Sequence, residues 1–345
     1  WIPRWTPEGL APGSFAFVMA TGIVGVGAAL TGLGALASVL VFIATLGYAC
    51  LVAAHAWRLL AYRAAMGRDL RDPRRAFGYF TFVAGTDVVA VCLAAAGRHG
   101  VATALLIVAL TTWLVLGYAV PWTAVLGSHP QPVLAAANGS WFIWVVASQS
   151  VAVVAATLQP VLTPARSALA VVAVLTWSVG LVLYAAAAVF VSLRLMLYEL
   201  TPEELDPTYW VSMGAVAITV VAGARVVEML QTPIVDATRG LVAGLSVVLW
   251  SFASWLIPVL VAVGVWRHVV HRVTLRYVPA MWSIVFPLGM YAVAGMYLGQ
   301  ADRLPFVEAV GRAWFWVGLA AWVLAAGAMT RSLALSVARG RNLGK

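Results

Sequence analysis

The stretch "TGLG" at residues 31–34 separates two long apolar spans, residues 12–30 and 35–62. An apolar helix of roughly 20 residues, rising 1.5 Å per residue, crosses the hydrocarbon core of a bilayer. A connection of only four residues requires the two spans that it joins to run antiparallel. The stretch "GRHG" at residues 97–100 joins a second pair of spans in the same way. The sequence therefore predicts a helical hairpin as the unit of the fold, repeated up to five times.

The composition extends this interpretation to the whole chain. Hydrophobic residues make up 63% of the 345 residues and charged residues only 10%, whereas soluble domains carry about 25% charged residues. The mean hydropathy is +0.97. We expect an all-α integral membrane protein that forms a single transmembrane domain over residues 1–345. The ten predicted spans are residues 12–30, 35–62, 78–96, 101–125, 138–157, 167–198, 209–231, 241–266, 279–299 and 306–330.

The positive charges predict the topology. The formal net charge is +9, but the arginines lie in short loops between apolar spans, so nucleic acid is not an expected partner. Fifteen of the 21 Lys and Arg residues lie on the side of the N-terminus, six of them in the loop at residues 58–75, and five lie on the other side. The positive-inside rule therefore places both termini in the cytoplasm. The first span leads into the second without a small-residue cleavage site, so no signal peptide is expected.

With this topology all five odd-numbered spans run outward, and equal counts from their starts reach equal depth. About nine residues, or roughly 13 Å, lead to a layer near the bilayer centre. The odd spans also carry more of the small and polar residues, which would line a pathway or equally form helix contacts. The layer contains Gly22, Asp87, Ala147, Ile218 and Phe286, and the further lining candidates are Thr21, Thr219 and Ser283.

Three charged residues within the odd spans are candidates for function. A carboxylate at the depth of Asp87 costs several kcal/mol unless it is protonated, paired or facing water. It is either a functional group or a structural hydrogen-bonding group. Arg225 and Glu228, three residues apart near the outer end of their span, are expected to form an ion pair at the mouth. The alternative is that Arg225 attracts anions there.

Familiar enzyme signatures are absent from the sequence. There is no phosphate-binding loop, no HExxH motif and no GxSxG motif, each of which would indicate a specific chemistry. We therefore expect no catalytic activity, no cofactor and no metal.

Three segments of the odd spans carry a family resemblance. In their order and spacing, "FAFVMATGI" (residues 15–23), "NGSWFIWVV" (138–146) and "WSIVFPLGM" (282–290) resemble the tellurite-resistance/C4-dicarboxylate transporter family, which is related to the plant slow anion channels. The resemblance implies five helical hairpins around a central pore, a phenylalanine that blocks the middle of the pore, and a homotrimer with one pore per subunit. The residue that matches the blocking phenylalanine is Phe286.

Pro287, next to Phe286, interrupts an otherwise apolar span. A proline lacks an N–H and crowds the preceding turn, so it kinks a helix. Such a defect is tolerated in a membrane where protein or a water-filled cavity satisfies the freed carbonyl. From the residues alone, an ordinary kinked helix with a core phenylalanine remains open. The resemblance favours a gate formed by Phe286.

The expected function is transport of inorganic anions or small dicarboxylates across the cell membrane, in a channel-like manner. Asp87 conflicts with this function unless it is protonated, faces away from the pore, or couples a proton to a carboxylate substrate. A proton-coupled carrier for dicarboxylate or sulfite-type anions is therefore the alternative within transport. A ligand-binding membrane sensor or enzyme is the alternative of another class. The physiological anion, the trigger of gating and any role of tellurite stay open.

Overall fold

The computed structural model describes residues 6–127 and 132–342, and all regular secondary structure within them is helical. Ten helical segments there are long and apolar enough to cross a membrane, which confirms the ten predicted spans. Arg4 and Lys345 of the charge count lie outside the described residues. The α-helices are α1 (Ala16–Leu30), α2 (Gly34–Ala61), α3 (Arg63–Arg71), α4 (Phe80–Ala95), α5 (His99–Val120), α6 (Phe142–Leu158), α7 (Arg166–Leu197), α8 (Val211–Val227), α9 (Pro233–Val265), α10 (Trp282–Ala301) and α11 (Pro305–Asn342).

The spanning helices divide into two classes by burial. In α1, α4, α6, α8 and α10, here called the inner helices, 67% to 83% of the most apolar stretch is buried. In α2, α5, α7, α9 and α11, the outer helices, the buried share is only 11% to 39%. The outer helices expose large apolar side chains such as Phe42, Tyr118 and Trp255. A surface of this kind is suited to contact with lipid.

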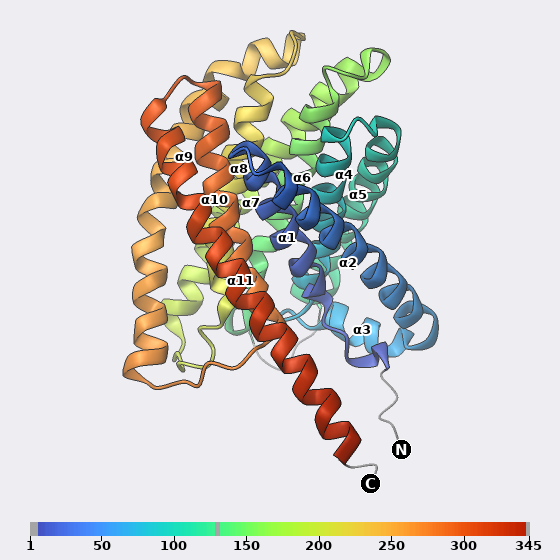
Figure 1. Cartoon of the computed structure of the whole chain (residues 1–345), viewed down its shortest axis with the longest axis vertical. Coiled ribbons are helices and arrows are strands. Elements are labelled where there is room, and N and C mark those ends of the chain that lie inside the picture. The colour runs from blue at the N-terminus through green and yellow to red at the C-terminus, as the bar shows by residue number, and fades with distance from the viewer. Residues whose placement is uncertain (1–5, 128–131, 343–345) are drawn as a thin grey trace.

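Packing between the helices follows the chain and also closes on itself. Each inner helix packs extensively against the outer helix that follows it. The inner helices also contact one another in the order α1, α4, α6, α8, α10 and back to α1. The amphipathic helix α3 and the C-terminal part of α11 lie at the same end of the bundle (Figure 1).

All five inner helices begin with a 3₁₀ turn at this same end. The turns are η2 (Pro12–Phe15), η3 (Ala76–Tyr79), η6 (Gly139–Trp141), η8 (Pro207–Trp210) and η10 (Pro279–Met281). The turns contact one another in the same cyclic order as the helices that they start. Two glycines permit this approach, since a Cβ at Gly78 would lie 3.0 Å from the backbone nitrogen of Gly13, and one at Gly139 would overlap the backbone of Thr208.

Two predicted boundaries were wrong, and one predicted loop contains a helix. The eighth span begins at Pro233 instead of residue 241, because Asp236 and Arg239 form an ion pair on the first turns of α9 (3.8 Å) instead of marking a loop. Arg239 also donates to the carbonyls of Val227 and Met229, so it caps the end of α8. The tenth helix continues past residue 330 to Asn342, and the loop at residues 58–75 contains the short helix α3.

Candidate functional site

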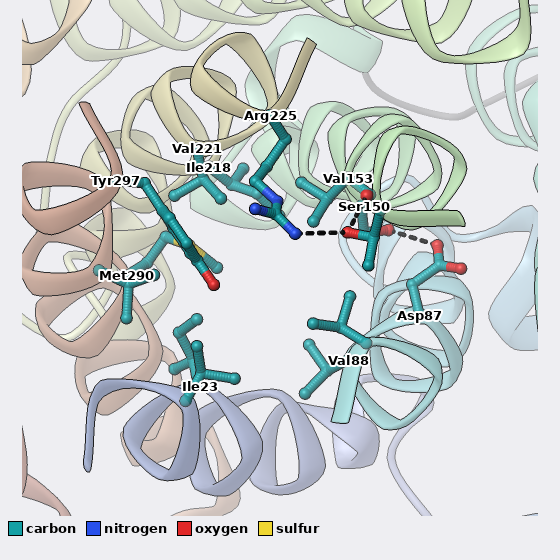
Figure 2. Close-up of a pocket in the computed structure, with 14 residues that line it drawn as sticks. Ile23, Asp87, Val88, Ser150, Val153, Ile218, Val221, Arg225, Met290 and Tyr297 are labelled. Carbon is teal, nitrogen blue, oxygen red and sulfur yellow. Dashed lines mark hydrogen bonds between the residues drawn. The ribbon is translucent and has the colours of Figure 1, made fainter. Parts of the chain in front are cut away.

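A cavity opens among the inner helices in the half of the bundle away from the 3₁₀ turns. It has an empty volume of about 480 Å³, its open mouth included, and every inner helix contributes to its wall. We call it the outer cavity. Figure 2 shows its side chains pointing toward one another from the surrounding helices. Its lining residues are Ile23, Val26, Asp87, Val88, Val91, Ser150, Val153, Thr157, Ile218, Val221, Arg225, Met290, Val293 and Tyr297.

The lining residues of three helices follow one spacing. On each helix they occupy positions i, i+3 and i+7, which lie on one face of an α-helix. The polar residues of these sets lie at the first or the last position, and the set on α6 has one at each. The three sets are Ser150, Val153 and Thr157 on α6, Ile218, Val221 and Arg225 on α8, and Met290, Val293 and Tyr297 on α10.

Asp87 is the acidic residue of this wall and is almost fully buried, with 1% of its surface exposed. Its Oδ2 atom lies 2.7 Å from the Ser150 hydroxyl, which lies 2.9 Å from the carbonyl oxygen of Ala147. The Oδ1 atom of Asp87 is buried and has no hydrogen-bond partner. A buried ionised carboxylate needs several hydrogen bonds or a cation to offset its lost hydration. The described neighbours supply one hydroxyl, which suits the neutral acid better than the ion.

Arg225 points into the outer cavity beside Tyr297 (Figure 2). It pairs with Glu228 at 2.8 Å, as its spacing from that residue suggested, and both side chains are partly exposed. Its guanidinium also reaches the Thr157 hydroxyl at 3.5 Å and lies 5.0 Å from the centre of the Tyr297 ring. Arg225 is therefore both half of an ion pair and part of the wall. These contacts hold its guanidinium at the wall of the outer cavity.

Phe286 is 1% exposed and is not among the lining residues of the outer cavity. One turn further along α10, Met290 lines the outer cavity, and one turn back, Ser283 lines a second cavity. This inner cavity has an empty volume of about 610 Å³, its mouth included, and is formed at the ring of 3₁₀ turns. Along α10, Phe286 therefore lies between lining residues of two cavities that the same five helical segments form, although it lines neither cavity itself.

Pro287 packs across to the neighbouring inner helix. A Cβ on Gly214 of α8 would lie 2.8 Å from Pro287 Cγ and 3.3 Å from Phe286 Cε1, so the glycine makes room for both rings. The helix continues on both sides of Pro287. Because proline has no N–H, the carbonyl of Ser283 loses its helical donor. Ser283 lines the inner cavity, where water can reach a free carbonyl.

The other sequence candidates divide between cavities and helix contacts. Ile218 lines the outer cavity with Asp87. Thr21 instead accepts a hydrogen bond from Trp322 Nε1 of α11 (3.1 Å), and a Cβ on Gly22 would overlap Val88 of α4. These two positions hold α1 against its neighbours.

Two further candidates are buried within the helix packing. The hydroxyl of Thr219 donates to the carbonyl of Ala215 (2.7 Å), and the backbone carbonyl of Thr219 accepts from Trp177 Nε1 of α7 (3.1 Å). Ala147 is fully buried and lines neither described cavity, although its carbonyl contacts the Ser150 hydroxyl. Both residues are therefore placed among helix contacts.

Sequence reasoning missed Ser150, Thr157 and Tyr297, which carry polar groups of the outer cavity. The missing signal was the face of each helix. Equal depth places one residue per helix in a layer, but a layer contains residues on every side of each helix. Extending the i, i+3, i+7 spacing from Ile218 to Arg225 gives the correct face of α8. On α6 and α10 the same spacing starts from Ser150 and Met290, which were not among the predicted layer residues, so it could not lead from Ala147 or Phe286 to Thr157 or Tyr297.

Comparison with known proteins gives a match over nearly the whole chain. The family model for voltage-dependent anion channels matches residues 9–330. Uncharacterized membrane proteins from two strains of Mycobacterium tuberculosis are 54% identical over 157 residues, which cover 46% of this chain and 80% of each relative. An uncharacterized transporter of Methanocaldococcus jannaschii is 24% identical over 145 residues, or 42% of this chain and 41% of the transporter.

Proposed function

We propose that this chain, which belongs to the voltage-dependent anion channel family, carries small anions along the common axis of its inner helices. The proposed path leads through the outer cavity, past Phe286 and through the inner cavity. The observation that carries the proposal is the position of Phe286 between two cavities walled by the same five helical segments. In the described state the buried ring closes the path, and its displacement would open it.

The wall of the outer cavity favours small, singly charged anions over dicarboxylates. Most of its side chains are apolar, and its one cationic side chain, Arg225, is already paired with Glu228. A dicarboxylate would need two cationic partners to offset the hydration that it loses. A weakly binding wall also suits fast passage, because an ion that binds tightly leaves slowly. We therefore propose a channel for inorganic anions such as chloride or nitrate.

A proton-coupled carrier is the second candidate, and one observation supports it. Asp87 lies in the wall with an unpartnered oxygen, so it could exchange a proton with a bound substrate. The two candidates differ in electrical behaviour. A channel gives a current whose reversal potential follows the anion gradient alone, whereas a carrier moves protons in a fixed ratio to its substrate.

The proposal includes the setting of the protein. We place it in the cell membrane with both ends of the chain in the cytoplasm, so that the inner cavity faces the cytoplasm. The lipid-suited outer helices and the charge distribution support this arrangement. A homotrimer with one path per subunit follows from the family resemblance.

The test of the gate is anion flux through liposomes that contain the full chain, measured for the wild type and for Phe286→Ala. If the ring closes the path, its removal raises chloride and nitrate flux per protein. The matched control is Phe315→Ala. Phe315 is about as buried, at 2% exposure, but it belongs to the outer helix α11 and packs against Gly27 of α1. Truncation of either ring leaves a cavity that costs about 3 to 5 kcal/mol of stability.

The comparison of the two variants separates a gate from a core residue. We expect both to lose stability and only Phe286→Ala to gain flux. Equal flux from wild type and Phe286→Ala, with the loss of stability seen in Phe315→Ala, would show that Phe286 is merely part of the core. Flux of protons in proportion to the anion would select the carrier.

A further inference from the structure

The inner cavity combines the starts of five long helices. Its wall includes one or more residues of each 3₁₀ turn, among them Gly13, Gly78, Ser140, Thr208 and Pro279. The turns lead directly into inner helices of 15 to 20 residues. The first N–H groups of a helix lack helical partners, and the aligned peptide dipoles place partial positive charge at that end. Five such ends meet around one cavity.

Several of these helix starts lack a side-chain cap. The residues that precede η2, η3 and η10, which are Ala11, Arg75 and Val278, offer no side-chain hydrogen bond to the turn that follows. Only η6 and η8 have such caps, from Asn138 and Asp206. Partial positive charge therefore remains available at three of the five starts.

Ser140 adds an independent observation that points to a ligand. Its hydroxyl is buried, with the residue 6% exposed, and it has no hydrogen-bond partner. The backbone N–H of Ser140 donates to Asn138 Oδ1 (2.8 Å), which fixes the residue at the wall of the inner cavity. The hydroxyls of Thr81 and Thr208 are already used, the first on the carbonyl of Gly78 and the second on Asp206. An unpartnered buried hydroxyl is costly unless something occupies the cavity beside it.

Two arginines give the wall a net positive charge. Arg74 and Arg75 both line the inner cavity, and no acidic residue is among its described lining residues. Arg75 shares the carboxylate of Asp69 (3.1 Å) with Arg58 (2.6 Å), so this cluster keeps one positive charge in excess. Among the described residues, no carboxylate forms an ion pair with Arg74. Its guanidinium is therefore free to meet an anion.

We propose that the inner cavity is a binding site for a small, singly charged inorganic anion of halide or nitrate size. The Ser140 hydroxyl donates to the anion, Arg74 supplies the opposite charge, and the uncapped helix starts contribute partial positive charge. The inference rests on the proposed function, since it gives a transported anion a resting position on the cytoplasmic side of Phe286.

The test is binding of bromide to the purified full chain in detergent. Bromide replaces gluconate at constant ionic strength, and the rise in melting temperature with bromide concentration gives the Kd. We expect Ser140→Ala to weaken bromide binding about 3- to 10-fold, the effect of one lost hydrogen bond. We expect Arg74→Gln to weaken it as well, and because Arg74 is exposed, this second variant should fold even if Ser140→Ala does not.

Each variant has a matched control. Arg71→Gln removes an exposed arginine from the same end of the bundle but away from the cavity wall, and Ser212→Ala removes a hydroxyl that already donates to the carbonyl of Tyr209. Both controls should keep the wild-type Kd. Equal Kd values for wild type, Ser140→Ala and Arg74→Gln would overturn the site. An equal loss with Arg71→Gln would reduce it to general charge attraction, which also overturns it.

The bromide-binding test of the inner cavity and the flux test of the proposed function can fail independently of each other. Bromide binding that depends on Ser140 in a protein whose Phe286→Ala variant shows no flux would leave the site standing without the path. Flux that rises in Phe286→Ala while Ser140→Ala binds bromide as well as wild type does would leave the path standing without the site.

Discussion

Asp87 is the residue whose charge state matters most to an anion path. Its side chain reaches the outer cavity, yet the described structure offers it one hydroxyl partner, Ser150, and leaves its second oxygen without any. An ionised Asp87 would repel anions at the wall and would lose most of its hydration. A neutral Asp87 removes both objections. On the proposed path, a neutral Asp87 would act as a hydrogen-bonding group and an ionised Asp87 as a barrier to anions.

The first prediction is that Asp87→Asn keeps the fold and abolishes any pH dependence of anion flux that arises from this wall. Asparagine keeps the shape and the hydrogen bond to Ser150 but cannot ionise. In the wild type, flux should fall as rising pH removes the proton from Asp87, and in the variant it should stay level. The measurement is liposome flux across a pH series, with yield and monodispersity as the check on folding.

The control for this prediction is Ser150→Ala. It removes the hydroxyl that can stabilise the ionised carboxylate but leaves Asp87 able to titrate, so its flux should still depend on pH. If Asp87→Asn and the wild type respond to pH identically at normal yield, Asp87 has no part in transport.

At this scale the sequence predicted part of the site. Asp87 was identifiable because a carboxylate inside an apolar span is costly, and the pairing of Arg225 with Glu228 followed from spacing. Ser150 and Tyr297 were not identified, because a serine or a tyrosine in a membrane helix is unremarkable until a cavity is known to lie beside it. Single-residue arguments find charges more readily than hydroxyls.

At the scale of the helix, a close backbone contact joins α10 to α11. A Cβ on Gly311 would lie 2.6 Å from the backbone nitrogen of Met296 and 2.7 Å from the carbonyl oxygen of Ala292. Gly295 and Gly299, four residues apart on α10, meet the backbone of α11 in the same way. This small-residue pattern lets two membrane helices approach closely. It fixes α10, and therefore Phe286, against an outer helix.

The second prediction concerns this contact. Gly311→Ala should lower the stability of the protein by about 1 to 3 kcal/mol, because its methyl group meets backbone atoms that cannot yield without moving a helix. Gly327→Ala on the same helix is the control, since a Cβ there has nothing within 4 Å. Alanine favours helix over glycine, so Gly327→Ala should be neutral or slightly stabilising. Thermal unfolding in detergent measures both, and equal stability of the two variants would contradict the role of the contact.

Helix existence was predictable here and helix ends were less so. Ten spans followed from apolar length alone, but the start of α9 was misplaced because Asp236 and Arg239 were taken as loop residues. In the structure Arg239 donates to the carbonyl of Val227, the last residue of α8, and to that of Met229 just beyond it. Such a partner lies on another element, so the sequence around residue 239 could not reveal it.

At the scale of the whole molecule, the closed ring of inner helices determines where the two cavities form. Hydropathy predicts that a span crosses the membrane, and the charge distribution predicts its direction. Neither predicts that α10 returns to α1, because that contact joins residues far apart in the chain and depends on side-chain shape. The ring of 3₁₀ turns escaped prediction for the same reason. The five turns have in common only that each begins with a glycine, alanine or proline. That they contact one another follows from the packing of the whole bundle.

The last prediction tests the direction of that bundle in the membrane. The end that holds α3, the 3₁₀ turns and the inner cavity should face the cytoplasm, because the loop at residues 58–75 carries six arginines. A cysteine at Gly67 in α3 has open space around it, and one at Arg98 lies in the exposed turn between α4 and α5, at the other end of its span. An impermeant thiol reagent added to intact cells should label Arg98→Cys at once. It should label Gly67→Cys only after the membrane is opened. The native cysteines give little background, since Cys92 is buried and Cys50 is exposed on the membrane-spanning part of α2, where a water-soluble reagent has little access.

Labelling of Gly67→Cys in intact cells would show that the bundle has the opposite orientation in the membrane. The inner cavity with Ser140 and Arg74 would then face the outside, and any anion bound there would be one that arrives from the external solution.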